Sequence, residues 1–212
     1  MNSRVFLLLC LLSFSQFAYS EQPVPVNFND KNSAFNSVIN KLQNNRVIRS
    51  QFKQSRKLKI LKKPLISTGK INFFSGTGII WEINQPIRSK VIISENKITE
   101  ITLLDDKETI NTNPNTAGFY TVLESIFNGH IEQIKKHFSA SFTGDIKNWV
   151  INLTPSTEPL NKIFTNIKLS GTRQINAITF NDYNQDTTII ELTASQKNPE
   201  PITKKEEAYF AL

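Results

Sequence analysis

The sequence predicts a mainly β fold with α-helices: a single-domain, unclosed antiparallel β-barrel of about nine to eleven strands, covered by two or three helices. Two observations support this. Runs of β-branched and aromatic residues recur at short spacing, with turns rich in Gly, Pro, Asn and Asp between them. Two other segments carry apolar residues at helical spacing. No internal repeat or linker divides the chain, which indicates one domain.

Residues 1–20 are predicted to be a signal peptide, and residues 21–212 the mature domain. Arg4 precedes the apolar run 5–12, and Ala18 and Ser20 supply the small residues that signal peptidase needs. The run is too short to anchor the chain in a bilayer. We therefore expect an exported, soluble protein.

The mature domain contains no cysteine, because Cys10 is the only one in the chain. Disulfides, thiol nucleophiles and zinc–thiolate sites are therefore excluded from it. A chain of this length buries roughly 70% of its unfolded surface, so a hydrophobic core alone can hold it together.

Two helices are predicted, at residues 33–44 and 117–128, after an extended lead-in at 21–28. Ser33 is a candidate N-cap for the first helix, and Gly129 a stop for the second. A further helical turn or two is expected at 130–136. The apolar stripes that would cover the sheet are Phe35, Val38, Ile39 and Leu42 in the first helix, and Phe119, Leu123 and Phe127 in the second.

The strands are expected in the order of the apolar runs. Residues 47–60 alternate, with the odd-numbered positions from Arg49 to Lys59 all polar and therefore exposed to solvent. Residues 90–94 and 97–104 form a hairpin, 105–116 a polar loop, and 158–162 a short turn or helix. The tail from 197 to 207 is polar, and Tyr209 and Phe210 dock it. The other predicted strands are 65–74, 79–83, 138–142, 148–153, 164–170, 175–181 and 187–194.

The apolar residues of these strands fit either a packed interior or a cavity for a hydrophobic ligand. Twelve of the fifteen phenylalanines and both tryptophans lie after residue 20. The candidate cavity-lining residues are Phe52, Leu58, Ile71, Phe73, Ile79, Trp81, Ile92, Trp149, Ile151 and Leu153.

The net charge of +7 is concentrated in one segment. These cations suit either an anionic membrane surface or a solvated strand whose lysines block aggregation. No nucleic-acid-binding motif is present. The cations are Arg46, Arg49, Lys53, Arg56, Lys57, Lys59, Lys62 and Lys63.

No residue is nominated for catalysis, for a cofactor or for a metal, so we do not expect an enzyme. His130 and His137 would lie about 10 Å apart on one helix, too far to share a metal. Asp182 opens a segment like a calcium loop, but Thr187 and Thr193 stand where the loop needs Gly and Glu. That segment is predicted to be a polar hairpin turn.

The order of segments resembles the periplasmic outer-membrane lipoprotein carrier family, the LolA-like proteins. The resemblance spans nearly the whole mature chain. Its residues are the first helix, Ser50–Gln54, Gly69–Ile71, Ile79–Pro86, Trp149–Pro155 and the closing strands at 163–169, 175–180 and 187–192. It implies a periplasmic carrier, expected to be a monomer, whose helices act as lids over a cavity for acylated or other apolar cargo. An inner-membrane exporter would supply the lipoprotein or lipid, and an outer-membrane acceptor would take it.

The resemblance departs at Ser75 and Gly76, where the carriers usually have Arg-Pro. In the carriers that arginine is tied to lid closure and cargo transfer, so both a lipoprotein and another lipid or pigment stay open as cargo. Two other function classes also stay open. One is a structural or assembly module of the cell envelope with a packed interior, and the other is a hydrolase.

Overall fold

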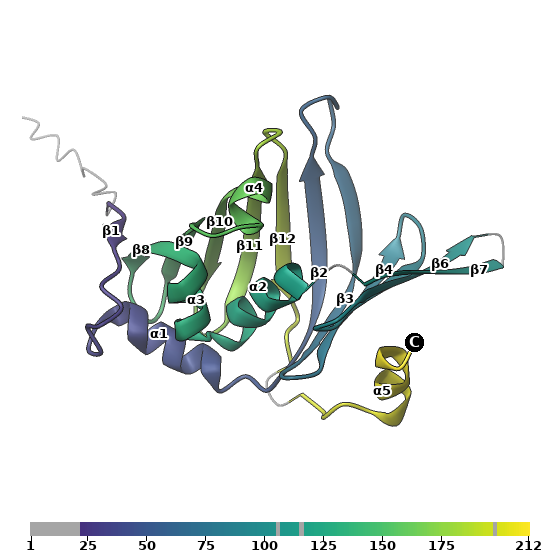
Figure 1. Cartoon of the computed structure of the whole chain (residues 1–212), viewed down its shortest axis with the longest axis horizontal. Helices are drawn as coiled ribbons and strands as arrows, with labels where there is room; N and C mark the ends of the chain where they lie inside the picture. The colour runs from purple at the N-terminus through teal and green to yellow at the C-terminus, as the bar shows by residue number, and fades with distance from the viewer. Residues whose placement is uncertain (1–21, 105–106, 115–116, 197–198) are drawn as a thin grey trace, which may run out of the picture.

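The computed structural model describes residues 22–104, 107–114, 117–196 and 199–212. In these residues, twelve strands form one antiparallel sheet in the order β1-β8-β9-β10-β11-β12-β2-β3-β4-β5-β6-β7. The sheet curves without closing, and five helices lie against it (Figure 1). The predicted fold class is confirmed, with more strands and more helices than predicted.

The elements have the following bounds. The strands are β1 (Val24–Pro25), β2 (Val47–Lys57), β3 (Leu65–Phe74), β4 (Gly78–Gln85), β5 (Ser89–Ile93), β6 (Ile98–Leu104), β7 (Lys107–Asn113), β8 (Phe138–Gly144), β9 (Trp149–Pro155), β10 (Phe164–Gly171), β11 (Ile175–Asp182) and β12 (Thr187–Thr193). The helices are α1 (Ala34–Gln43), α2 (Ala117–Asn128), α3 (Ile131–His137), α4 (Leu160–Ile163) and α5 (Lys204–Phe210).

Two meanders, β2–β7 and β8–β12, make up the sheet together with β1, which pairs with β8. They join where β12 pairs antiparallel with β2, from Thr187 opposite Lys57 to Thr193 opposite Gln51. This pairing connects the start and the end of the domain, so the sheet is continuous although α1, α2 and α3 interrupt the chain.

The inner face of the sheet, the face that carries Phe73, is covered by α1 and α2. Ser33 caps α1 by accepting a hydrogen bond from the Asn36 amide at 3.2 Å. The Phe127 ring of α2 stacks on Phe73 with centroids 5.3 Å apart. The other apolar residues of the predicted stripes are also buried, namely Phe35, Val38, Ile39, Leu42 and Leu123. The side chain of Phe119 lies outside the described residues.

The outer face of β3–β5 carries an apolar patch of Phe74, Ile80 and Ile92 among polar residues, and α5 lies on it. The sequence predicted a polar tail here, but Thr203 and Glu206 form a capping box that starts a helix. The Phe210 ring meets Phe74 edge-on at 6.3 Å, and the Lys90 ammonium donates a hydrogen bond to the Tyr209 hydroxyl at 2.6 Å. The prediction that Tyr209 and Phe210 dock the tail is confirmed.

Ile92 belongs to this outer face and not to the predicted cavity. It pairs with Ile80 on one side and Thr99 on the other, and all three are buried. Its neighbours Val91 and Ile93 point to the inner face, because successive side chains of a strand alternate. The sequence does not reveal which of two apolar faces borders a cavity.

Arg49 fastens α5 to the sheet. Its guanidinium donates to both Glu206 carboxylate oxygens, at 2.6 and 2.8 Å, and to the carbonyls of Glu200 and Pro201, at 3.0 and 2.9 Å. The same group lies 5.1 Å from the Phe74 ring centroid. The prediction that this position is solvated was therefore wrong, because the tail covers it. The other cations of the basic segment are exposed.

The Arg49 hydrogen bonds also shift two pKa values. They lower the pKa of Glu206 to about 2, with further help from hydrogen bonds of Thr203. The same carboxylate raises the pKa of Arg49. The pair therefore stays charged through the neutral range.

The predicted loop at 105–116 is largely a strand. β7 pairs with β6 from Ile98 opposite Asn113 to Leu104 opposite Lys107. All seven of its residues are exposed, and the sequence shows no alternation of apolar and polar residues there. The strand is recognised only by its main-chain hydrogen bonds to β6.

We predict that Glu206→Gln lowers the free energy of unfolding at pH 7 by about 1–2 kcal/mol, after allowance for solvent screening. The native carboxylate has a pKa below its ordinary value, so its stabilisation is complete above pH 4.5 and is lost toward pH 2. Urea unfolding at pH 7 and near pH 2 measures the difference, which should disappear at the lower pH. Glu207→Gln, on the exposed side of α5, is the control and should have little effect at either pH.

Candidate functional site

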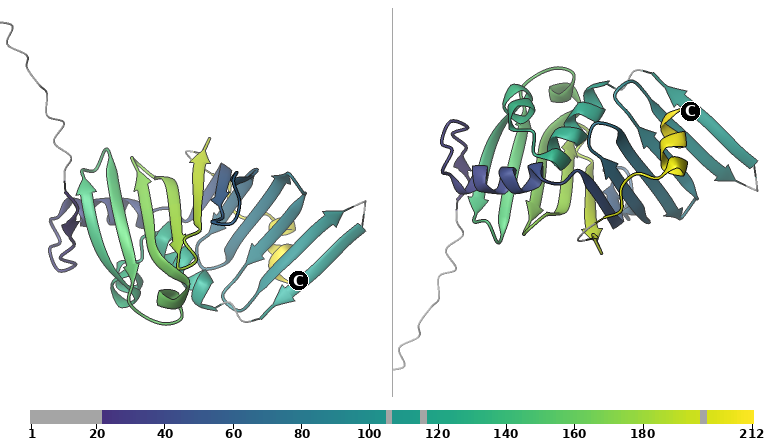
Figure 2. Two further views of the ribbon diagram at one scale, coloured as in Figure 1. Left: turned by 90° about the horizontal axis from the view of Figure 1, so that it is seen from above. Right: turned by 90° about the horizontal axis from the view of Figure 1, so that it is seen from below.

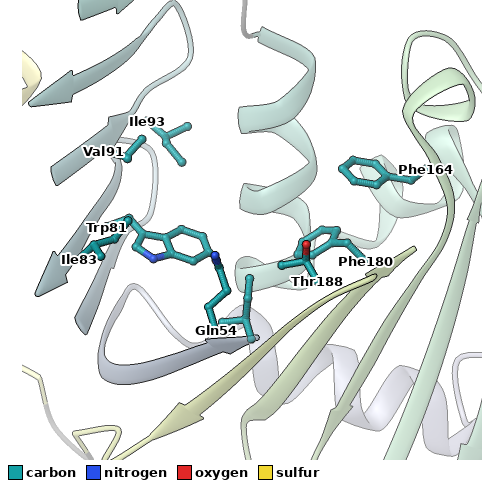
Figure 3. A pocket seen from close by; sticks show the side chains of 9 residues that line it. Gln54, Trp81, Ile83, Val91, Ile93, Phe164, Phe180 and Thr188 are labelled. Atoms are coloured by element: carbon teal, nitrogen blue, oxygen red, sulfur yellow. The ribbon is translucent and has the colours of Figure 1, made fainter. Parts of the chain in front are cut away.

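An apolar pocket of about 290 Å³ lies on the inner face, between two walls of the curved sheet (Figure 3). One wall comes from β4 and β5, and the other from β10, β11 and β12. Gln54 of β2 lies between the walls (Figure 3). The lining residues are Gln54, Trp81, Ile83, Val91, Ile93, Phe164, Phe180, Thr188 and Ile190.

Strand alternation and cross-strand pairing place these side chains. Trp81 and Ile83 stand two residues apart on β4, and Trp81 pairs directly with Val91 of β5. On the opposite wall Phe180 pairs with Thr188. In the sheet order, β2 and β3 separate the two walls, so it is the curvature of the sheet that makes them face each other (Figure 2).

Trp81 connects the pocket to the packed core. Its ring meets Phe52 edge-on, with centroids 5.2 Å apart. Its indole nitrogen is buried and has no hydrogen-bond partner within the described part of the chain. Burying an unpaired donor is unfavourable, so the packing of the ring must stabilise this position.

The lining of the pocket is chemically simple. No lining side chain is charged, and Gln54 and Thr188 are the polar ones apart from the indole of Trp81. The volume lies near the lower end of the roughly 300–1,000 Å³ typical of ligand pockets. Such a pocket suits an apolar group, because an ion would lose its hydration without gaining a partner.

The structure separates the predicted cavity residues into groups. Trp81 lines the pocket. Leu58 lies just beyond the end of β2 and is half-buried, and Ile92 is on the outer face. The remaining predicted residues are buried in the packed core, namely Phe52, Ile71, Phe73, Ile79, Trp149, Ile151 and Leu153.

Sequence reasoning missed most of the pocket. Ile83, Val91 and Ile93 alternate with polar or outer-face residues, and this alternation is the signal that could have found them. Phe180 and Ile190 alternate in the same way on β11 and β12. Phe164 is out of phase with Ile167 and Leu169, because β10 has a register shift between Phe164 and Asn166. No periodicity shows that these two sets face each other, because that depends on the curvature of the sheet.

The turn between β3 and β4 holds α2 in place. The Asn128 side-chain amide donates to the Ser75 hydroxyl at 3.1 Å, and the Gly76 amide donates to the Glu124 carboxylate at 3.2 Å. Gly76 has φ +73°, the left-handed conformation that favours glycine. At the two positions where the carriers usually have Arg-Pro, this chain thus holds the helix with a hydroxyl and a main-chain amide.

Two further groups near the helices have shifted pKa values. Burial raises the pKa of Tyr120 in α2, and the neighbouring Glu124 carboxylate adds to the effect. Burial lowers the pKa of His137, which lies 2.8 Å from the Thr157 hydroxyl, and Lys136 adds to that shift. Because its pKa is lowered, His137 is predominantly neutral at pH 7.

The described ranges hold neither a cluster of metal ligands nor a helix that could span a membrane. No three His, Cys, Asp or Glu side chains gather as metal ligands there. Asp182 instead accepts hydrogen bonds from the Asn184 and Asp186 amides, which confirms the predicted hairpin turn. No described helix combines the length and apolar character needed to cross a bilayer.

Comparison with known proteins gave structural matches alone. No family model matches the sequence, and no curated protein matches it. A LolA superfamily protein from Nitrosomonas europaea is 8% identical with a TM-score of 0.44, over 80% of this chain and 97% of that chain. An outer membrane lipoprotein-sorting protein domain from Vibrio parahaemolyticus is 9% identical with a TM-score of 0.41, over 84% of this chain and 99% of that chain.

The Pseudomonas aeruginosa MucA/MucB complex structure also matches. Its matched chain is 8% identical with a TM-score of 0.45, over 82% of this chain and 59% of that chain. One of these structures is a LolA superfamily protein, from the group that the sequence resembles. At this identity and overlap the likeness concerns the fold alone, and it assigns no cargo or partner to this chain.

We predict that Asn128→Ala loosens α2, because the Ser75 hydroxyl then loses its donor. The loss of one such hydrogen bond lowers local stability by about 1 kcal/mol, or roughly fivefold in amide-exchange protection. Hydrogen exchange of the α2 amides, followed by mass spectrometry, measures this change. The control is Asn40→Ala on the exposed side of α1, which should leave α2 protection as it was.

Proposed function

We propose that this chain is a non-enzymatic periplasmic carrier, which shields an acylated or otherwise apolar cargo between the inner and outer membranes. The observation that carries the proposal is the uncharged pocket between the two walls of the unclosed sheet. The predicted signal peptide and the resemblance to lipoprotein carriers support it. An inner-membrane exporter and an outer-membrane acceptor would be the partners.

The energetics of an acyl chain fit such a pocket. Each methylene removed from water contributes about 0.8 kcal/mol, so a bare chain does not cross an aqueous space unaided. A pocket of about 290 Å³ encloses part of a chain, and therefore holds it less tightly than full burial would. Loose binding is what a carrier needs, because the acceptor must be able to remove the cargo.

Longer cargo requires the pocket to grow. The hydrogen bonds of Ser75 and Gly76 to α2 are weak enough individually to break and reform, so α2 can act as the mobile lid. Opening the lid would expose Phe73, which Phe127 covers in the closed arrangement.

The second candidate is an envelope module with a packed interior. One observation favours it: seven of the predicted cavity residues lie in the packed core. A binding measurement separates the two candidates, because a packed module has no apolar ligand to exchange.

We predict that Val91→Phe weakens the binding of an acyl probe at least about tenfold, because the added ring occupies the pocket. Titration of delipidated protein with a fluorescent fatty-acyl probe measures the affinity. Ile66→Phe is the matched control, since Ile66 is exposed on β3 outside the pocket, and it should bind as the unchanged protein does.

Native mass spectrometry of protein purified gently from the periplasm, with lipid extraction, would identify the cargo class. A protein that carries no lipid and also binds no added acyl probe would contradict the carrier proposal. A probe that binds the Val91→Phe variant as well as the unchanged protein would place the ligand elsewhere.

A further inference from the structure

β7 is the last strand of the sheet within the described residues. All seven of its residues are exposed, and no described strand lies beyond it. Figure 2 shows β7 at the far margin of the sheet from β1, on the side where α5 lies. Such an edge offers unpaired main-chain donors and acceptors to another strand.

Most of the usual protections of an edge are missing from β7. Proteins shorten edge strands, place lysines and other charges along them, or interrupt them with proline or bulges. The opposite edge follows this rule, since β1 has two residues and ends in Pro25. β7 has no proline, keeps an unbroken register with β6, and has its charges, Lys107 and Glu108, at one end.

The pairing of β5, β6 and β7 decides which β7 residues point their main-chain amide and carbonyl toward β6 and which point them outward. The Leu103 amide donates to the Arg88 carbonyl at 3.0 Å, so the amide of this β6 residue points toward β5. Its neighbours Leu104 and Thr102 point toward β7, where they pair with Lys107 and Thr109. The alternate residues of β7 therefore direct their amides and carbonyls outward, and these are Glu108, Ile110 and Thr112.

We propose that β7 pairs antiparallel with β7 of a second copy of this chain, with the two-fold axis at Ile110. This register pairs all seven residues. Ile110 lies opposite Ile110 of the second copy, and Glu108 lies opposite Thr112. The outward-pointing residues thus meet outward-pointing residues, and each such pair exchanges two main-chain hydrogen bonds.

The side chains also suit this register. Lys107 meets Asn113 and Glu108 meets Thr112 of the second copy, so no like charges are opposed; a parallel pairing would oppose Lys107 to Lys107. Ile110 is 51% exposed and borders a groove of about 380 Å³, which is also lined by Ile101, Tyr209 and Leu212. Pairing about the two-fold axis places the two grooves next to each other, and each Ile110 is then covered by the second copy.

A strand-edge contact is small, well below the roughly 1,200–2,000 Å² of a standard interface. The dimer is therefore weak and reversible, and it forms only at high protein concentration. It leaves the cargo pocket free, because the pocket lies on the inner face and the Ile110 groove on the outer face.

Cysteine cross-linking tests the register directly. With Cys10→Ser the full chain has no cysteine. Ile110→Cys then places two thiols on the axis, with Cα atoms about 5.5 Å apart, within the span of a disulfide. Mild oxidation should yield a covalent dimer. Glu108→Cys or Thr112→Cys alone places the thiols about 14 Å apart and should not cross-link. A mixture of these two variants should.

Sedimentation equilibrium tests the association without added thiols. The Ile110→Lys variant should dissociate at least about tenfold more readily, because it opposes two charges on the axis. Ile60→Lys makes the same change at a position 87% exposed and distant from β7, and should dimerise normally.

Three results would overturn the proposal. The first is a chain that stays monomeric up to about 200 μM and whose Ile110→Cys variant does not cross-link. The second is a dimer that Ile110→Lys leaves intact. The third is cross-linking of the Glu108→Cys variant alone as fast as the Ile110→Cys variant, which would mean another register.

Discussion

Buried apolar side chains on both faces of one sheet are the constraint on which this structure depends. Phe73 and Phe74 are neighbours on β3, point to opposite faces, and are both buried. Each face must therefore be covered separately. α1 and α2 cover the inner face, and α5 covers the outer face at the opposite end of the chain. The fold is complete only when the last residues have returned to the first meander.

Covering both faces of β4 and β5 also positions the pocket. Trp81, Val91 and Ile93 form one pocket wall, while Ile80 and Ile92 of the same strands lie buried on the outer face next to α5. The contacts of Arg49 with Glu206 and of Lys90 with Tyr209 hold this helix against the back of the wall. The pocket thus depends on residues that do not touch it.

The sequence predicts those elements whose side chains repeat. The stripe Phe35, Val38, Ile39 and Leu42 identifies α1 with its cap at Ser33, and strand alternation identifies the sheet. β7 and α5 escape prediction because their stability comes from partners distant in the chain, a main-chain ladder for one and Arg49 for the other. Of the residues that line the pocket, the sequence predicted Trp81 alone. The curvature of the sheet decides which apolar side chains pack against each other and which border a cavity, and the sequence pattern does not show that curvature.

The contrast between the two ends of the sheet has a consequence for aggregation. A sheet with two open edges can add molecules without limit, as in a fibril. Here β1 contains Pro25, and the preceding Pro23 also lacks an amide hydrogen, so the first edge is a poor template. Among the described strands, β7 alone therefore leaves an edge suited to pairing. In the proposed dimer that edge is occupied in both copies, so strand addition stops at two molecules.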